Sequence, residues 1–139
     1  MGREEDLGAL CARLTRRLIA AERPILARHG VSMWEYVVMS ALARGEPETQ
    51  RALAEAIGYD KTRLIALLDR LQELGLLTRE PDTADRRARR VRLTAAGRAR
   101  HAAIRRDIRA MESELLHELE DDQRRTLRAA LARLAGPRA

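Results

Sequence analysis

A short connection between two helical segments, at residues 57–60, constrains the fold of this chain more than any other feature. Thr49 suits the N-cap of a helix over residues 50–57, and Asp60 suits the N-cap of a second helix. Gly58 supplies the left-handed backbone at which the first of these helices ends. Because only a tight turn fits between the two helices, the sequence predicts a helix-turn-helix.

The period of the hydrophobic residues changes after the second of these helices. Its apolar stripe consists of Leu64, Leu67, Leu68, Leu71 and Leu74, and Gly75 ends it. The positions that then alternate with polar neighbours are Leu77, Arg79, Val91 and Leu93. This alternation predicts two strands of a hairpin with its tip over residues 81–89. A helix-turn-helix followed by a basic hairpin is the pattern of a winged helix.

Two further helices are predicted before this unit. The first carries Leu7, Leu10, Leu14, Leu18, Ala21 and Ile25, ends or kinks near Pro24 and stops by Gly30. The second begins at Ser32, which forms a capping box with Glu35, and runs to about Arg44. We expect its inner face to consist of Met33, Tyr36, Val37, Ser40 and Ala41. Residues 45–48 are then predicted to form a turn.

Two more helices are predicted after the hairpin, and together with the first helix they carry a surplus of leucine. Thr94 caps a long helix whose stripe is Ile104, Ile108, Met111, Leu115 and Leu119. Asp121 or Asp122 starts the last helix, which bears Leu127, Leu131 and Leu134. A winged helix of this size cannot cover all of these residues, so we expect a partner surface. A two-fold homodimer built from both ends of the chain is the commonest solution.

The composition favours a helical protein. The 139 residues fit one domain, 45% of them are hydrophobic, and Phe is absent, so the core consists of Leu, Ala, Ile and Val. The predicted fold class is therefore mostly α with a small β-hairpin wing. No run is long enough to span a membrane, the N-terminus is acidic, and Cys11 has no intrachain partner, which together predict a cytoplasmic protein.

The sequence contains no enzymatic motif. His29, His101 and His117 are isolated from one another and from any cluster with metal-ligand spacing. There is no phosphate-binding glycine loop and no nucleophile motif. We therefore expect no enzyme activity, no catalytic residues, no metal and no cofactor.

The net charge of the chain is concentrated in one segment. Residues 61–100 hold eleven Lys and Arg against five Asp and Glu, whereas the remaining residues hold sixteen of each. Five arginines lie between Asp85 and Leu93. A local excess of this kind is the electrostatic footprint of an element that enters a DNA groove. The alternative is a solvated face in a chain that uses arginine throughout.

The first turn of the helix that begins at Lys61 has the side chains that a DNA-reading helix needs. Lys61, Thr62 and Arg63 are short or basic polar groups that reach phosphates and base edges, and the methyl group of Ala66 suits contact with a thymine methyl. Asp60 is assigned as a cap, because phosphates repel an unpaired carboxylate.

Further basic residues extend this candidate surface. Arg86, Arg89 and Arg90 add charge around the hairpin tip. Arg70 is a further candidate for DNA contact. For both Arg63 and Arg70 the alternative is an ion pair on the helix surface with Asp69 or Glu73.

The segment LAEAIGYDKTRLIALLDRLQELGLL, followed by DRRARRVRLTAAG, resembles the MarR family of bacterial transcriptional regulators. The residues that match the family signature are Asp85, Arg87, Leu93, Thr94 and Gly97, and the similarity runs from about Leu7 to Leu134. The resemblance implies one MarR-like domain over residues 1–139. It divides into a winged helix-turn-helix lobe (about 32–97) flanked by N- and C-terminal dimerisation helices (about 4–30 and 98–136).

The resemblance also implies roles for individual residues. Gln50 and Arg51 match positions that touch the DNA backbone. Arg87 matches the arginine that enters the minor groove, and Asp85 matches the carboxylate that orients it; narrow, AT-rich grooves attract such an arginine most. For Asp85, the alternative is that it only closes the hairpin by pairing with an arginine.

Many relatives of this kind are repressors, and the resemblance implies a dimeric repressor of an inverted-repeat operator in double-stranded DNA. Such proteins release DNA when a small, often phenolic or otherwise aromatic anion binds between the dimerisation helices and the winged helix. The residues expected near this pocket are Arg17, His29, Met33, Trp34 and Tyr36. The alternative is that Trp34 and Tyr36 serve only packing and capping.

Three other interpretations remain open. A branch of the family senses hydroperoxides through a cysteine early in the first helix, but Cys11 falls about one turn too late, and Met33 stands where that branch has a tyrosine. Arg13, Arg16 and Arg17 lie close enough in sequence to activate the thiol, whereas a buried packing role is the alternative. The second interpretation is an architectural DNA-binding protein without an effector. The third is a module whose helical ends bind another protein.

Overall fold

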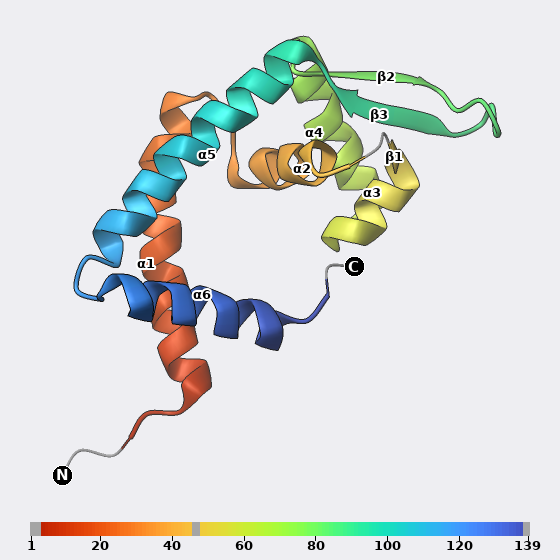
Figure 1. The fold of residues 1–139 in the computed structure, drawn as a ribbon. Helices are drawn as coiled ribbons and strands as arrows, with labels where there is room; N and C mark the ends of the chain where they lie inside the picture. Colours follow the sequence, from red (N-terminus) through yellow and green to blue (C-terminus); the bar gives the residue numbers. More distant parts are fainter. Residues whose placement is uncertain (1–3, 46–47, 138–139) are drawn as a thin grey trace.

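The computed structural model describes residues 4–45 and 48–137. In chain order the elements are α1 (Leu7–Arg28), α2 (Met33–Ala43), β1 (Glu48–Thr49), α3 (Gln50–Ile57), α4 (Lys61–Glu73), β2 (Leu77–Pro81), β3 (Arg89–Leu93), α5 (Ala95–Leu115) and α6 (Asp121–Ala135). Figure 1 shows α2, α3, α4 and the sheet grouped together, while the first half of α1 and α6 lie away from this group. The predicted fold class, mostly α with a hairpin wing, is confirmed.

The helices of the winged lobe begin at the predicted caps. The hydroxyl of Ser32 accepts the Glu35 amide at 3.2 Å, and the Glu35 carboxylate accepts the Ser32 amide at 2.7 Å, which is the expected capping box. Thr49 caps α3 and Asp60 caps α4, each accepting a backbone amide three residues on, at 3.1 and 2.8 Å. Gly58, with φ of 65°, ends α3.

The hairpin is confirmed, and a third strand that the sequence did not predict joins it. β2 and β3 pair antiparallel from Leu77 opposite Leu93 to Pro81 opposite Arg89. β1 pairs with the other edge of β3, giving the order β1-β3-β2. The predicted turn over residues 45–48 includes 46–47, which lie outside the described residues, and its last residue belongs to β1. Two residues are too few to show strand alternation in a sequence.

The core lies between α2, α4, α5 and the sheet. The residues of α4 that are fully buried are Leu64, Leu68 and Leu71, whereas Leu67 is half-buried and Leu74 is 45% exposed. The predicted leucine stripe of α4 is therefore right in register but narrower than expected. The other buried core residues include Val38, Met39, Val91, Leu93 and Ile104.

The inner face predicted for α2 does not coincide with its fully buried residues, although Met33, Tyr36 and Ala41 pack against the core. The buried residues are Glu35, Val38, Met39 and Leu42, and those expected to be buried, Met33, Tyr36, Val37, Ser40 and Ala41, are only half-buried. The physical reason is Glu35, whose carboxylate is 1% exposed. A buried carboxylate is tolerated only where its charge is paired and hydrogen-bonded, and Arg70 supplies the partner here.

A close contact fixes α5 against the end of the helix-turn-helix. Thr94 caps α5 as predicted: its hydroxyl accepts the Gly97 amide at 3.0 Å and donates to the Gly75 carbonyl at 2.7 Å. The Thr94 amide donates to the Leu76 carbonyl at 3.0 Å. A Cβ added to Gly97 would lie 2.0 Å from that same Leu76 oxygen, so only glycine fits at this position of α5.

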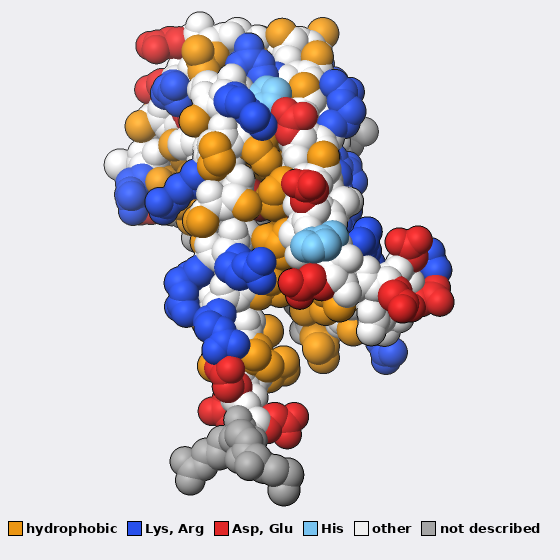
Figure 2. Space-filling view, turned by 90° about the vertical axis from the view of Figure 1, so that its left-hand side faces the viewer, with side chains coloured by type: hydrophobic (Ala, Val, Ile, Leu, Met, Phe, Trp, Pro, Cys, Tyr) orange, Lys and Arg blue, Asp and Glu red, His pale blue; other side chains and the backbone are white. Residues whose placement is uncertain are grey.

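The first and last helices leave leucine exposed. α1 does not end at Pro24 but continues to Arg28, and it stops before Gly30 as predicted. The exposed leucines are Leu7 (68%), Leu10 (43%), Leu131 (44%) and Leu134 (77%). In Figure 2, hydrophobic side chains are visible on the lower part of the face turned to the viewer, near the N-terminal end of α1, with charged side chains beside them. Within residues 4–45 and 48–137, no helix is both long and apolar enough to cross a membrane.

Candidate nucleic-acid interface

The buried leucines of α4 decide which of its residues face outward. Since Leu64 and Leu68 point into the core, Lys61, Thr62, Arg63 and Ala66 lie on the exposed side of the helix. Four of the five predicted contact residues of α4 are therefore exposed near the N-terminal end of the helix; the fifth, Arg70, lies further along it.

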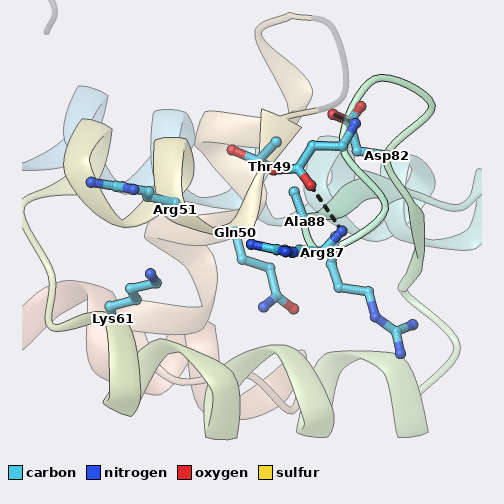
Figure 3. A pocket seen from close by; sticks show the side chains of 9 residues that line it. Thr49, Gln50, Arg51, Lys61, Asp82, Arg87 and Ala88 are labelled. Atoms are coloured by element: carbon cyan, nitrogen blue, oxygen red, sulfur yellow. Dashed lines mark hydrogen bonds between the residues drawn. The ribbon is translucent and has the colours of Figure 1, made fainter.

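A cleft of about 440 Å³ lies between the start of α3, the start of α4 and the hairpin tip (Figure 3). Its lining residues are Thr49, Gln50, Arg51, Lys61, Asp82, Asp85, Arg87, Ala88 and Arg89. Basic side chains from two helices and the wing thus surround one groove. Of the predicted residues, Arg86 and Arg90 lie on the wing without lining this cleft. Thr49, Asp82 and Ala88 line it without having been predicted, because nothing in their sequence pattern suggests a contact.

Two aspartates shape the hairpin tip. The Asp85 carboxylate accepts the backbone amide of Arg87 at 3.0 Å, and the Asp82 carboxylate accepts the amide of Asp85 at 3.2 Å. The amide of Asp82 donates to the Ala88 carbonyl at 2.9 Å. These bonds hold the turn from which Arg87 projects. Among the described residues the exposed Arg87 side chain makes no ion pair.

Arg90, which was predicted to add charge around the hairpin tip, is paired within the protein. Arg90 Nε donates to the buried carboxylate of Asp82 at 2.7 Å. This hydrogen bond, together with the charge of Arg90, holds the pKa of Asp82 below its ordinary value. The residue that closes the hairpin by pairing with an arginine is therefore Asp82, whereas that role was considered for Asp85. Arg90 adds less charge to the tip than expected.

A half-buried arginine joins the wing to both helices of the helix-turn-helix. Arg79 of β2 donates to Gln72 at 2.8 Å and to Gln50 at 3.4 Å, and it pairs with Asp69. Its side chain is 18% exposed. Because the carbonyl oxygen of Gln50 is used here, the amide NH₂ of Gln50 is the group left for a contact outside the protein. From its sequence pattern Arg79 was predicted only as a strand residue, since its partners lie in two separate helices.

Arg70, predicted as a DNA contact, is exposed, but its guanidinium is paired within the protein. Its guanidinium pairs with both carboxylate oxygens of Glu35, at 2.7 Å to Oε2, and donates to the Gly30 carbonyl at 3.2 Å. The expected alternative partners, Asp69 and Glu73, are also wrong. Arg70 thus connects α4 to α2 and to the end of α1.

The residues expected around an effector are not gathered in one place. A cavity of about 340 Å³ is lined by Ile19, Arg23, Leu26, Ala27, Val31, Ser32 and Met33, and Met33 is the only one of the five candidates among them. The others lie elsewhere. His29 bonds Asp107 at 2.7 Å, Trp34 contacts the ring of Tyr59, Tyr36 stacks on His101, and Arg17 is exposed.

Cys11 is exposed, so the alternative of a buried packing role is wrong within one protomer. In the part of the chain that the structure describes, no group of His, Cys, Asp or Glu side chains is placed to hold a metal ion.

A helix with an accessible basic N-terminal turn, beside an arginine-tipped hairpin, defines a winged helix-turn-helix DNA-binding protein. The model of the MarR family matches residues 29–88. The fold matches the apo structure of MarR from E. coli over the whole molecule, with a TM-score of 0.84, 22% identity, and coverage of 96% of this chain and 100% of that one. The chain is therefore similar to the MarR family in residues 29–88, and it has the fold of MarR.

Two other solved structures show what similar proteins bind. The transcriptional repressor CouR bound to a 23-mer DNA duplex is 27% identical, with a TM-score of 0.81 and coverage of 94% of this chain and 93% of that one. NadR in complex with 4-hydroxyphenylacetate is 21% identical, with a TM-score of 0.75 and coverage of 97% and 96%. These matches are to regulators rather than to enzymes.

Proposed function

We propose that the protein is a homodimeric repressor that binds an inverted-repeat operator and releases it when a small aromatic anion binds. The observation that carries the DNA-binding part is the cleft in which Arg51, Lys61, Arg87 and Arg89 converge from α3, α4 and the wing. A groove surrounded by cations from several elements fits a phosphate backbone, which supplies most of the affinity for DNA.

The proposed contacts divide into positioning and reading. Thr62, Arg63 and Ala66 contact base edges in the major groove, and Arg87 enters the minor groove from the turn that Asp85 shapes. The residues that contact phosphates are Gln50, Arg51, Lys61, Arg86 and Arg89. Arg70 and Arg90 serve the fold through Glu35 and Asp82. The complex of CouR with a 23-mer duplex supports DNA binding by a protein of this fold.

The exposed leucines of α1 and α6 support a dimer. Leu7, Leu10, Leu131 and Leu134 come from opposite ends of the chain, and a partner copy would remove them from water. Residues 4–30 and 98–136 are then the dimerisation helices, and residues 32–97 are the DNA-binding lobe. Two recognition helices in such a dimer lie about 34 to 36 Å apart, one turn of DNA.

The cavity between α1 and the start of α2 is the proposed effector site. It is mostly apolar, but Arg23 provides a cation and Ser32 a hydroxyl, which suits an aromatic anion. Met33 is the one candidate from the sequence that belongs to it, and Arg23 takes the place that was expected for Arg17. The complex of NadR with 4-hydroxyphenylacetate supports this class of ligand.

The test begins by selecting the genomic DNA fragments that the protein binds at moderate salt. Affinity is then measured for a selected duplex and for a shuffled duplex of the same composition. We expect a preference of about 10³-fold or more for a selected fragment that contains an inverted repeat. Equal affinity for both duplexes would contradict the proposal and favour an architectural protein. Sedimentation should give a dimer at micromolar concentration, and a monomer would contradict the inverted repeat.

The effector is tested with 4-hydroxyphenylacetate as the probe. It should weaken binding to the selected duplex in the parent protein, and it should do so much less in an Arg23→Ala variant. If a hydroperoxide instead releases DNA from the parent but not from Cys11→Ser, the protein is a thiol sensor.

A further inference from the structure

The guanidinium of Arg63 lies beside an aromatic stack that the sequence analysis did not connect with DNA. The ring of Tyr59 lies 4.4 Å from the ring of Trp34, centroid to centroid, with an angle of 38° between their planes. The guanidinium carbon of Arg63 lies 5.3 Å from the centroid of the same Tyr59 ring. Tyr59 is therefore in contact with an indole and with the arginine that is the candidate base reader of α4.

The backbone on both sides of this contact is fixed. The Tyr59 amide donates to the Ala54 carbonyl at 3.0 Å, and its half-buried side chain packs against the hydrophobic core. The amide of Arg63 donates to the carboxylate of Asp60 at 2.8 Å. Neither residue can shift without breaking a helix end, so the ring offers a fixed surface to a long, exposed side chain.

Trp34, the one tryptophan of the sequence, lies at the start of α2. It is 42% exposed, although large aromatic side chains are usually buried. Its position against Tyr59 connects α2 to the turn of the helix-turn-helix. The contact gives the tyrosine ring a neighbour outside the turn itself, which limits the orientations that the ring can adopt.

We propose that Tyr59 is a positioning and specificity-determining residue of the DNA interface, which acts by holding Arg63 in the direction of the base edges while Trp34 supports its ring. The inference rests on the proposed function, since it concerns the operator that this function requires. An arginine held on an aromatic face is attracted electrostatically by the ring. It also has fewer rotamers to lose when it binds, so less of the binding energy is spent on ordering it.

The expected size of the effect follows from the strength of such contacts. A cation over an aromatic ring at an exposed site changes an equilibrium by about two- to fivefold. Because a fixed guanidinium fork matters for a base edge and much less for a phosphate, this loss should fall on the selected duplex and spare the shuffled one.

The experiment is a double-mutant cycle on the dimer, with the selected and shuffled duplexes described above. Tyr59→Leu keeps an apolar side chain but removes the ring face, and Arg63→Ala removes the group that the ring holds. Tyr59→Leu should weaken binding to the selected duplex about two- to fivefold, leave the shuffled duplex unchanged, and have no effect in the Arg63→Ala background. Tyr59→Phe, which keeps the ring, should restore the parent selectivity.

Trp34→Leu provides a second variant, because an exposed side chain can be replaced with little risk to folding. It should reproduce part of the Tyr59→Leu defect, and circular dichroism should show parent-like unfolding. Equal losses on both duplexes, or the same loss of binding in the Arg63→Ala background, would show that Tyr59 serves folding alone and would overturn the inference. A selective parent with unaffected Tyr59 and Trp34 variants would overturn this inference only. A parent that binds all duplexes alike would overturn the proposed function and the inference with it.

Discussion

Replacing Arg87 by alanine separates a DNA-binding role of the wing from a structural one. The side chain is exposed at the hairpin tip, and the hydrogen bond that shapes the tip uses its backbone amide, at 3.0 Å from Asp85. Alanine keeps that amide, so the free energy of unfolding should change by no more than about 0.5 kcal/mol. The melting temperature and the dimer state should therefore match those of the parent protein.

DNA binding should nevertheless be lost to a large extent. The guanidinium makes no ion pair among the described residues, and it lines the cleft with Arg51 and Lys61. A hydrogen bond from a charged group contributes about 1.5 to 3 kcal/mol. A dimer has two wings, so a tenfold loss of affinity for the operator, about 1.4 kcal/mol, is the smallest effect we expect. The assay is fluorescence anisotropy of a labelled operator duplex at one fixed salt concentration.

A matched control is Arg92→Ala on the same hairpin. Arg92 is exposed and pairs with Glu80 at 3.2 Å, but it does not line the cleft. Its removal should weaken binding less than about threefold through long-range charge alone. Asp85→Ala should give a smaller version of the Arg87 defect, because it loosens the turn but keeps the guanidinium. Normal operator binding by Arg87→Ala, or loss of binding only together with loss of the dimer, would refute the assignment.

Three other predictions concern α4, the α5 junction and a buried histidine. Arg63→Ala should reduce the binding free energy for the operator by about 1 to 3 kcal/mol and relax the base preference. Lys61→Ala should weaken binding to all DNA sequences alike and reduce the slope of log affinity against log salt by about one. Both effects are measured by titration of binding at several salt concentrations. Gly97→Ala should lower the free energy of unfolding by about 3 kcal/mol in urea denaturation, because its Cβ meets the Leu76 carbonyl at 2.0 Å. Burial, and then the charges of nearby arginines, lower the pKa of His101 below 6.5. The free energy of unfolding should therefore fall as the pH drops below 6.5 toward the folded-state pKa. His101→Gln should lessen that fall, as measured by urea titrations across this pH range.

Each of these has a result that would contradict it. Equal losses on operator and random duplex for Arg63→Ala would make Arg63 a phosphate contact. For the glycine, Gly45→Ala is the control, because a Cβ at Gly45 meets nothing within 4 Å; equal stability of both variants would show that α5 shifts at no cost. For the histidine, identical pH profiles of parent and variant would show that His101 is not the group responsible.

Local sequence signals predicted the helix starts and the hairpin, and long-range contacts explain the failures. Thr49, Asp60 and Thr94 act through amides three residues away, so their role is visible in a short window. The inner face of α2 was predicted only in part, because Glu35 is buried and paired with Arg70, 35 positions further along the chain. A periodicity argument assumes that carboxylates face water, and it has no means of finding such a partner.

The same distinction applies to the candidate interface. The charge excess and the resemblance predicted the basic residues that line the cleft, including Lys61 and Arg87. They did not predict the contacts that support these residues. Examples are the hydrogen bonds from Arg79 to α3 and α4, and the packing of Trp34 against Tyr59. Of the five residues predicted near the effector, only Met33 lines the cavity between α1 and α2. The lining of such a cavity depends on how the two helices pack, which the sequence pattern does not show.

Because β3 continues directly into α5, the long helix and the wing should move as one rigid unit. Thr94 alone separates the two elements, and Gly97 is packed against the Leu76 backbone, so no flexible linker absorbs a rotation between them. With 21 residues, α5 is about 31 Å long. A tilt of about ten degrees at its far end, where α1 and α6 lie, would move the wing by about 5 Å, more than one base-pair step of DNA. In the proposed dimer, small changes in how the helical ends pack would therefore change the distance between the two wings.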